Sequence, residues 1–327
     1  MPARRVLLLF NPVSGAGRAA RLAEAARQAL AAAGHDVLAK ATERTAPERS
    51  GTIPAWLAEA LVGRDVAVVV GGDGAVRLTV DAIARAGAAL WHCPAGTENL
   101  FARAFGMVAD PRQLLAALER WDLHPIDLGS FEGLDAAVGD GPGAAPATFT
   151  IMASIGFDAH VIHDLALHRR GAITHLSYVP AIARTLRRWR PVEVSVAIDG
   201  GMPETLGRGV LIVGNLGEYA FRIDPVRVAK PDDGLLDAVF LPASTGLAAL
   251  AWGPRFILTR SLLGREIVGL RRFQATTVRV VTATPTLWQA DGDPAGPTAD
   301  AAGAGGTGAV EIGIRRGAVR VLRPPSW

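Results

Sequence analysis

Three glycine-bearing segments in the first third of the chain contain residues suited to binding phosphate groups. They are residues 11–18 (NPVSGAGR), 71–74 (GGDG) and 94–97 (PAGT). Glycine lets backbone N–H groups approach a ligand closely, and a helix that begins after such a turn adds the positive end of its dipole. The Asp73 carboxylate could hold a metal ion or a ribose hydroxyl. These residue types favour a phosphate-bearing ligand, although residues 11–18 lack the Gly-Lys-Ser/Thr ending of a Walker A motif.

Short apolar runs precede these segments and predict the elements that must position them. Buried parallel strands are expected at residues 6–10, 35–42, 66–70 and 89–93. Helical spacing predicts helices at residues 18–33 and 54–62, after the GGDG segment to about residue 86, and at residues 99–105. Strands that alternate with helices predict a parallel sheet covered on both faces, with ligands at the carboxyl ends of the strands. We therefore expect the three segments to lie at one edge of the sheet.

The second half of the chain has a different pattern, in which short apolar runs are separated by turn residues. The runs are residues 148–154, 192–198, 210–213, 238–241, 277–281 and 309–314. This spacing is typical of an antiparallel β domain. Two helical patches, at residues 174–189 and 247–263, interrupt the strands. The sequence therefore predicts two domains, as the length of 327 residues also does.

The composition excludes several classes of protein. Half of the residues are apolar and 20% are charged, which excludes a disordered chain. The single cysteine, Cys93, excludes a disulfide framework and fits the reducing cytosol. The apolar stretch at residues 244–264 is interrupted by Pro254, Arg255 and Arg260, so we expect no transmembrane helix. The net charge of +3, without a basic stripe interleaved with aromatic residues, disfavours nucleic acid and is compatible with an anionic membrane surface.

Six motifs in order resemble the diacylglycerol kinase catalytic domain family, which includes bacterial lipid kinases and the sphingosine and ceramide kinases. They are NPxSG, GGDG, PAGTxNxxAR, SIGFDA, DDGLLD and DGD, and they run from Asn11 to Asp293. The resemblance implies a three-layer α/β nucleotide-binding domain at residues 1–125, similar to that of NAD kinases and phosphofructokinases. A β-sandwich for lipid and metal would follow at residues 126–309, with ATP in the cleft between the domains. Residues 310–327 would return to complete the first domain.

The resemblance also implies roles for individual residues. The nucleotide would contact Asn11, Ser14, Gly15, Thr42, Gly71, Gly72, Asp73, Gly74 and Thr97. Asp293 would be the catalytic base, with Asp291 as a partner or alternative base and Asp73 as a further catalytic carboxylate. A structural Mg²⁺ would bind the side chain of Asp233 and the carbonyls of Lys230 and Leu235. The Asp-Asp-Gly sequence at the metal position is also an ordinary turn signal, so the turn does not require a metal.

Several positions depart from the family pattern. Ala75 and Arg77 follow the GGDG segment where the family has Thr and Asn, and Glu98 replaces a glycine. Asp293 replaces a glutamate and is one methylene shorter. Alanine cannot offer a hydroxyl to a phosphate, although the backbone donors of the loop remain. Arg77 could place a cation near the phosphates or could face solvent.

The implied function is an ATP- and Mg²⁺-dependent kinase that phosphorylates the hydroxyl of a diacylglycerol-like lipid. Its partners would be ATP, a membrane lipid and the inner membrane surface, which a cytoplasmic protein would contact peripherally. A catalytically impaired homologue that binds nucleotide or lipid, and a kinase of another lipid such as a sphingoid base, remain alternatives. A soluble-metabolite kinase such as an NAD kinase is disfavoured by the SIGFDA and DDGLLD matches. The cluster of Arg184, Arg187, Arg188 and Arg190 could contact anionic headgroups or could be a solvated helix face. The oligomeric state stays open.

Overall fold

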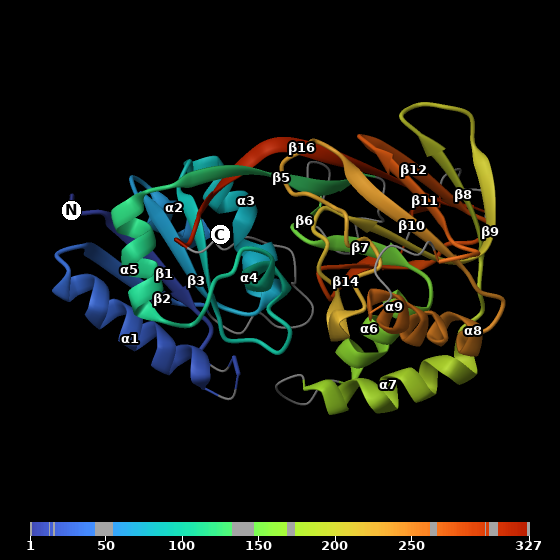
Figure 1. The fold of residues 1–327 in the computed structure, drawn as a ribbon, viewed down its shortest axis with the longest axis horizontal. Helices are drawn as coiled ribbons and strands as arrows, with labels where there is room; N and C mark the ends of the chain where they lie inside the picture. The colour runs from blue at the N-terminus through green and yellow to red at the C-terminus, as the bar shows by residue number, and fades with distance from the viewer. Residues whose placement is uncertain are drawn as a thin grey trace. The chain divides into compact units, whose positions relative to one another are not determined.

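The computed structural model describes residues 2–12, 14–15, 17–42, 55–132, 147–168, 174–261, 267–297, 299–300 and 307–325. The chain divides into two compact units (Figure 1). The N-terminal unit consists of Met1–Leu128 and Arg316–Trp327, and the C-terminal unit consists of Gly129–Arg315. Two strands, β5 (Leu123–Glu132) and β16 (Gly308–Leu322), begin in one unit and end in the other.

The N-terminal unit is built on a parallel sheet. Its strands are β1 (Arg5–Phe10), β2 (Asp36–Ala41), β3 (Val66–Gly71) and β4 (Ala89–Pro94), and the end of β16. They lie in the order β16, β4, β3, β1, β2. Every side chain of β3 is buried, as expected for a strand covered on both faces. The predicted parallel sheet is therefore confirmed.

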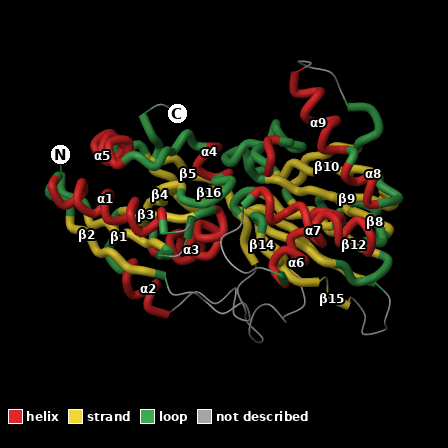
Figure 2. The backbone as a smooth tube through the Cα atoms, turned by 90° about the horizontal axis from the view of Figure 1, so that it is seen from below, coloured by secondary structure: helices red, strands yellow, loops and turns green. Residues whose placement is uncertain are grey.

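Helices cover both faces of this sheet, which gives three layers. They are α1 (Arg18–Ala32), α2 (Ala55–Leu61), α3 (Asp73–Ala86), α4 (Leu100–Ala104) and α5 (Pro111–Arg120). Helix α1 packs against α5 on one face, and α2 packs against α3 on the other (Figure 2). The chain moves from β1 outward to β2 and then back to β3 and β4 on the other side of β1. Since crossovers between parallel strands are generally right-handed, this reversal places α1 on one face and α2 and α3 on the other.

The C-terminal unit is an antiparallel β structure. One sheet orders β14 (Asp293–Pro297), β13 (Leu287–Ala290), β7 (Met152–Ile155), β9 (Glu204–Gly214), β10 (Leu236–Pro242) and β11 (Arg271–Ala275). The second contains β6 (Ala147–Phe149), β5, β16, β12 (Thr277–Thr282), β8 (Glu193–Ile198) and the short β15 (Ala299–Asp300). The long strand β9 pairs with β8 through its first half and with β7 and β10 through its second. It thereby joins the two sheets.

The apolar core of the C-terminal unit is enclosed by side chains from both sheets. Its largest members are Trp288, Phe131, Phe149 and Phe240, all buried. The rings of Phe131 and Phe149 are 5.3 Å apart, and those of Phe131 and Trp288 are 5.7 Å apart. Aromatic pairs at this spacing stabilise a core beyond the area that they bury.

Four α-helices in the described part of the C-terminal unit lie outside the sheets. They are α6 (Phe157–Leu167), α7 (His175–Arg188), α8 (Gly246–Leu250) and α9 (Trp252–Ser261). None of the helices in the described residues has the length and apolar character that crossing a bilayer requires.

The structure corrects two predicted elements. Residues 148–154, expected as one strand, form β6 and β7, which are interrupted at Thr150 and Ile151 because their backbone N–H groups bond to the Asp291 carboxylate instead of a neighbouring strand. The helical patch expected at residues 247–263 consists of α8 and α9, separated at Ala251, and its last two residues lie outside the described part of the chain.

The packing at Gly129 gives a first prediction. A Cβ atom there would lie 2.0 Å from the ring of Phe149, which the core holds in place. Gly129→Ala should therefore destabilise the protein by about 1–3 kcal/mol, the usual cost of overpacking. Urea denaturation measures the loss. Gly313→Ala is the matched control, because its Cβ would meet Ser130 at an ordinary 3.7 Å. Equal midpoints for both variants would contradict the packing argument.

Candidate active site

The three glycine-bearing loops of the N-terminal unit lie together at the carboxyl ends of β1, β3 and β4. A Cβ atom on Gly15 would lie 2.4 Å from the carbonyl oxygen of Ala95, and one on Gly96 would lie 2.6 Å from the Cα of Gly72. The backbone N–H of Ala95 donates to the carbonyl of Gly71 at 2.8 Å. The loops therefore approach so closely that side chains at Gly15 and Gly96 would not fit.

Asp73 connects two of these loops. It begins α3, and its carboxylate accepts hydrogen bonds from the backbone N–H groups of Leu100 and Phe101, both at 2.9 Å. These donors belong to the first turn of α4, immediately after the PAGT loop. Burial raises the pKa of Asp73 to about 6 against the opposing effect of the two bonds. The carboxylate thus holds the two loops in register.

Asn99 closes the PAGT loop from its other end. Its side-chain oxygen accepts from the N–H of Gly96 at 2.8 Å, and its amide donates to the carbonyl of the same residue at 2.9 Å. The backbone of Asn99 has φ +50°, a left-handed conformation that asparagine adopts more readily than most residues. The amide is therefore used to shape the loop.

The other predicted nucleotide contacts lie at the same strand ends. The N–H of Ser14 donates to the carbonyl of Asn11 at 3.0 Å, which forms the turn after β1. The N–H of Thr42 donates to the carbonyl of Phe10 at 2.8 Å, so the threonine lies where β2 ends beside β1. Ala75 and Arg77 are both half-buried in α3.

His92 is a site-supporting residue that sequence reasoning missed. It is fully buried on β4, and its Nε2 lies 3.0 Å from the carbonyl of Gly71. Burial lowers the pKa of His92 to about 4, so the ring is neutral near pH 7. A neutral imidazole with Nε2 protonated donates to this carbonyl and fixes the end of β3 where the GGDG loop begins. A histidine within an apolar run gave no signal of this bond.

In the C-terminal unit, the predicted catalytic sequence Asp-Gly-Asp forms a tight hairpin. Asp291 and Gly292 have φ +48° and +83° and join β13 to β14. Positive φ at both central residues is the conformation for which Asp-Gly is favoured in two-residue hairpins. Asp293 then begins β14 opposite Ala290 and is half-buried.

The Asp291 side chain is buried. Its carboxylate accepts four hydrogen bonds of 2.7 to 2.9 Å, from the N–H and hydroxyl of Thr150 and from the N–H groups of Ile151 and Met152. Burial raises the pKa of Asp291, and the four donors oppose that rise. The hairpin therefore does not present its two carboxylates as a pair, because Asp291 is occupied in holding the connection between β6 and β7.

A hydrogen-bonded chain links the SIGFDA motif to the same hairpin. Asp158 accepts from the hydroxyl of Ser154 and, at 2.9 Å, from that of Tyr219. The Gln289 amide donates to Ser154 at 2.6 Å, and its oxygen accepts from the N–H of Gly292 at 3.0 Å. Sequence analysis identified the motif but not this connection, since its members are far apart in the chain.

The predicted metal position is a turn with oxygen donors. The N–H of Leu235 donates to Asp233 at 3.0 Å, and Asp233 and Lys230 are exposed. Asp237 follows on β10, where one carboxylate oxygen is buried without a partner. Burial raises the pKa of Asp237, the charge of Asp233 raises it further, and Lys230 lowers it. Two neighbouring carboxylates, one of them unsatisfied, fit a hard divalent cation. No group of three or more His, Cys, Asp or Glu residues in the described ranges could hold a metal.

Comparison with known proteins identifies the family. Residues 5–131 match the diacylglycerol kinase catalytic domain, and residues 151–322 match the YegS C-terminal NAD kinase beta sandwich-like domain. The chain belongs to the diacylglycerol kinase catalytic domain family. It is therefore a member of a family of lipid kinases, as the order of its motifs indicated.

Individual relatives cover nearly the whole chain. The diacylglycerol kinase of Mycobacterium tuberculosis (strain ATCC 25618 / H37Rv) is 28% identical over 322 residues, which are 98% of this chain and 95% of that protein. The structure of a diacylglycerol kinase from Bacillus anthracis str. Sterne covers 100% of this chain and 99% of its own, with a TM-score of 0.67 and 18% identity. An NAD kinase from Archaeoglobus fulgidus in complex with ATP covers 98% and 94%, with a TM-score of 0.51 and 14% identity. The last two likenesses confirm the predicted fold.

The raised pKa of Asp73 predicts a pH dependence of stability. The folded state binds the proton more tightly than the unfolded chain, whose aspartate pKa is near 4. Stability from this group is therefore full below about pH 4 and declines as the pH rises through about 6. Relative to Asp73→Asn, the wild type should lose on the order of 1–3 kcal/mol over this interval. Urea denaturation between these pH values measures both proteins. Parallel pH profiles would contradict the assignment.

Proposed function

We propose that the protein is an ATP-dependent lipid kinase that phosphorylates the hydroxyl of a diacylglycerol-like lipid. The observation that carries this proposal is the convergence of three glycine loops at the ends of parallel strands, in a chain of a lipid kinase family. The diacylglycerol kinase relative from M. tuberculosis, aligned over almost the entire length, supports the choice of lipid.

The glycine loops bind the phosphates of ATP in this proposal. The proposed contacts are Asn11, Ser14, Gly15, Thr42, Gly71, Gly72, Gly74 and Thr97, which supply mainly backbone donors and hydroxyl groups. Asp73 affects nucleotide binding indirectly, because its carboxylate accepts hydrogen bonds from the start of α4 and so holds the GGDG loop in place. Phosphoryl transfer depends on such positioning and on charge stabilisation more than on covalent chemistry by the protein.

Asp293 is the proposed general base. The lipid hydroxyl oxygen attacks the γ-phosphorus, the bond to the bridging β–γ oxygen breaks, and ADP leaves with that electron pair. The hydroxyl proton passes to the Asp293 carboxylate. The neighbouring Asp291 is unsuited to this step because the N–H and hydroxyl groups of residues 150–152 already occupy both of its oxygens.

A divalent cation, Mg²⁺ in this proposal, binds at the turn before β10. Asp233 and the carbonyls of Lys230 and Leu235 would hold it, and Asp237 would face it with its unsatisfied oxygen. When bound, the ion supplies positive charge that compensates the two carboxylates and orders the turn.

A binding protein without turnover is the second candidate. The observation that favours it is Ala75, which follows the GGDG loop and has no hydroxyl to offer a phosphate. The backbone N–H donors of the GGDG loop do not depend on the side chain at position 75, and this favours a kinase over a binding protein. Another lipid acceptor, such as a sphingoid base, would leave the site and the chemistry unchanged.

Lipid-dependent release of ADP tests the activity and the base together. Wild-type protein should produce ADP when diacylglycerol and Mg²⁺ are present, and Asp293→Asn should be slower by about 10²–10⁴, the usual range for loss of a general base. Its melting temperature should not change. Asp291→Asn is the matched control, because it makes the same change two residues away. It should lower the melting temperature, since its amide group would face buried donors.

Two results would reject parts of this proposal. A wild-type rate for Asp293→Asn would exclude it as the base. No lipid-dependent ADP with either diacylglycerol or a total lipid extract would favour the binding protein.

The metal position is tested by thermal stability. Mg²⁺ at about 100 times its Kd should add roughly 2.7 kcal/mol and raise the melting temperature by several degrees. Asp233→Ala should abolish that increase, and Asp232→Ala, the matched control on the adjacent exposed residue, should retain it. The same Mg²⁺-induced shift in all three proteins would place the ion elsewhere.

A further inference from the structure

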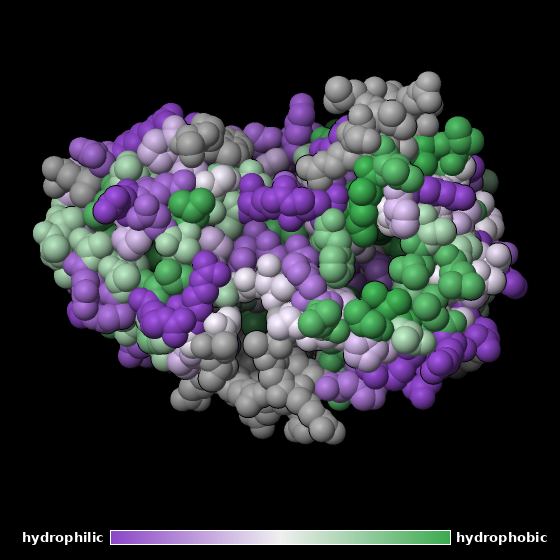
Figure 3. All heavy atoms as spheres, turned by 60° about the horizontal axis from the view of Figure 1, so that its bottom comes forward, coloured by the Kyte–Doolittle hydropathy of each residue, from purple (hydrophilic) through white to green (hydrophobic). Residues whose placement is uncertain are grey.

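Three neighbouring helices of the C-terminal unit expose apolar side chains. Helix α7 contacts α8, and α8 contacts α9. Its exposed apolar residues, here called the helical face, are Leu176, Val179, Leu247, Leu250, Ile257 and Leu258. Leu176 is 80% exposed, Leu247 71% and Leu258 64%. Figure 3 shows apolar side chains gathered over this unit, at the right of the view. An apolar surface of this kind marks an interaction site.

The sequence of α7 explains why its apolar residues face outward. Ala181 and Thr185 form its buried side, whereas Leu176, Val179 and Arg187 follow one another at helical spacing on the exposed side. The outward side is thus apolar in the first two turns of the helix and basic in the last. Exposed apolar side chains beside basic residues are the two features that hold a helix at a membrane interface.

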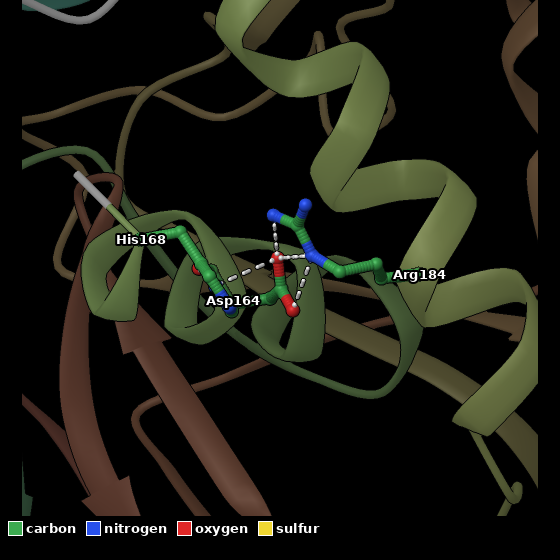
Figure 4. Close-up of polar contacts among 3 residues, drawn as sticks. All are labelled: Asp164, His168 and Arg184. Atoms are coloured by element: carbon green, nitrogen blue, oxygen red, sulfur yellow. Dashed lines mark hydrogen bonds and ion pairs between the residues drawn. The ribbon is translucent and has the colours of Figure 1, made fainter. Parts of the chain in front are cut away.

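Helix α7 is fixed in this orientation by its contacts with α6. Figure 4 shows the guanidinium of Arg184 against the carboxylate of Asp164, with Nε 2.9 and 3.1 Å from its two oxygens and a terminal nitrogen 2.6 Å from one. His168 lies 3.5 Å from the same carboxylate. At the end of α7, the ring of Trp189 packs edge-on against Phe157 at 5.6 Å. The helix therefore cannot turn to bury Leu176 and Val179 without breaking these contacts.

The charge of the surface favours an anionic partner. The sequences of α7, α8 and α9 contain five arginines and no Asp or Glu. Arg187 and Arg188 are exposed at the end of α7, Arg190 follows them, and Arg255 is exposed on α9. Anionic headgroups attract basic residues beside a membrane, and the acyl region takes apolar side chains.

We propose that the helical face docks on an anionic lipid bilayer. The bilayer satisfies both features, since it offers negative charge at its surface and an apolar interior beneath. A second copy of the chain would bring the same arginines against each other without an acidic partner from these helices. The inference rests on the proposed function in one respect, which is that a lipid acceptor lies in a bilayer. Docking itself needs neither nucleotide nor turnover.

Co-sedimentation with vesicles tests the docking. The probes are vesicles of phosphatidylcholine alone and of phosphatidylcholine with phosphatidylglycerol, without ATP. Wild-type protein should bind the second kind more tightly, and salt should weaken that binding. The double variant L176E/V179E should lose at least roughly tenfold in affinity, because its charged side chains cannot enter the apolar region. The double variant R187S/R188S should lose about tenfold or more on anionic vesicles and little on neutral ones.

Met202→Glu is the matched control. Met202 is 89% exposed in the turn between β8 and β9, outside the helical face, so its substitution adds a negative charge away from that face and should leave binding unchanged. Wild-type affinity in L176E/V179E, or an equal loss in the control, would overturn the proposal. So would a wild-type dimer that L176E/V179E converts to monomer in sedimentation velocity, which would make the face a contact between two copies.

The kinase assay separates this inference from the proposed function. With a short-chain diacylglycerol in detergent, L176E/V179E should release ADP at the wild-type rate, because docking is not needed there. If wild type binds anionic vesicles but never releases ADP, the proposed function fails and the docking stands. If ADP is released but no vesicle binds, the docking fails alone.

Discussion

The C-terminal unit depends on one buried carboxylate. Asp291 collects the N–H groups of three successive residues and a hydroxyl, and these groups would otherwise be buried without partners. Buried polar groups are costly when unpaired, so a single side chain decides how the chain passes from β6 to β7. The same residue has a positive φ and begins the turn into β14. The hydrogen bonds that hold Asp291 in place therefore also set the position of Asp293, two residues later.

The N-terminal unit uses a comparable arrangement. Asp73 bonds to the first turn of α4, and His92 bonds to the carbonyl of Gly71, so the GGDG loop is fixed from two sides. Glycine at positions 15 and 96 then lets the loops touch. In each unit, an aspartate that the sequence suggests as catalytic, Asp73 or Asp291, instead holds the backbone of a neighbouring segment in place by accepting its N–H groups. In the glycine loops, the principal hydrogen-bond donors are therefore backbone N–H groups.

The sequence predicted the parallel sheet well, because continuous apolar runs such as residues 66–70 have few other interpretations in an alternating pattern. It also predicted that the glycine loops share an edge, since that follows from parallel strands alone. It did not reveal the partners of Asp291, which lie 140 residues away in the case of Ile151. Local pattern carries no information on such contacts, and the same limit hid the interruption at Thr150. The motif order identified the family, whereas the roles of Asp293 and Asp233 stay predictions.

The path of β16 has a consequence for synthesis of the chain. Arg320 and Val321 pair with Ala89 and Leu90, so the edge of β4 is completed by residues that leave the ribosome long after it. During translation the nascent parallel sheet must persist with that edge unpaired, and exposed strand edges promote aggregation. Closure of so long a loop is also slow. Completion of the parallel sheet therefore has to wait until residues more than two hundred positions further along the chain have been made.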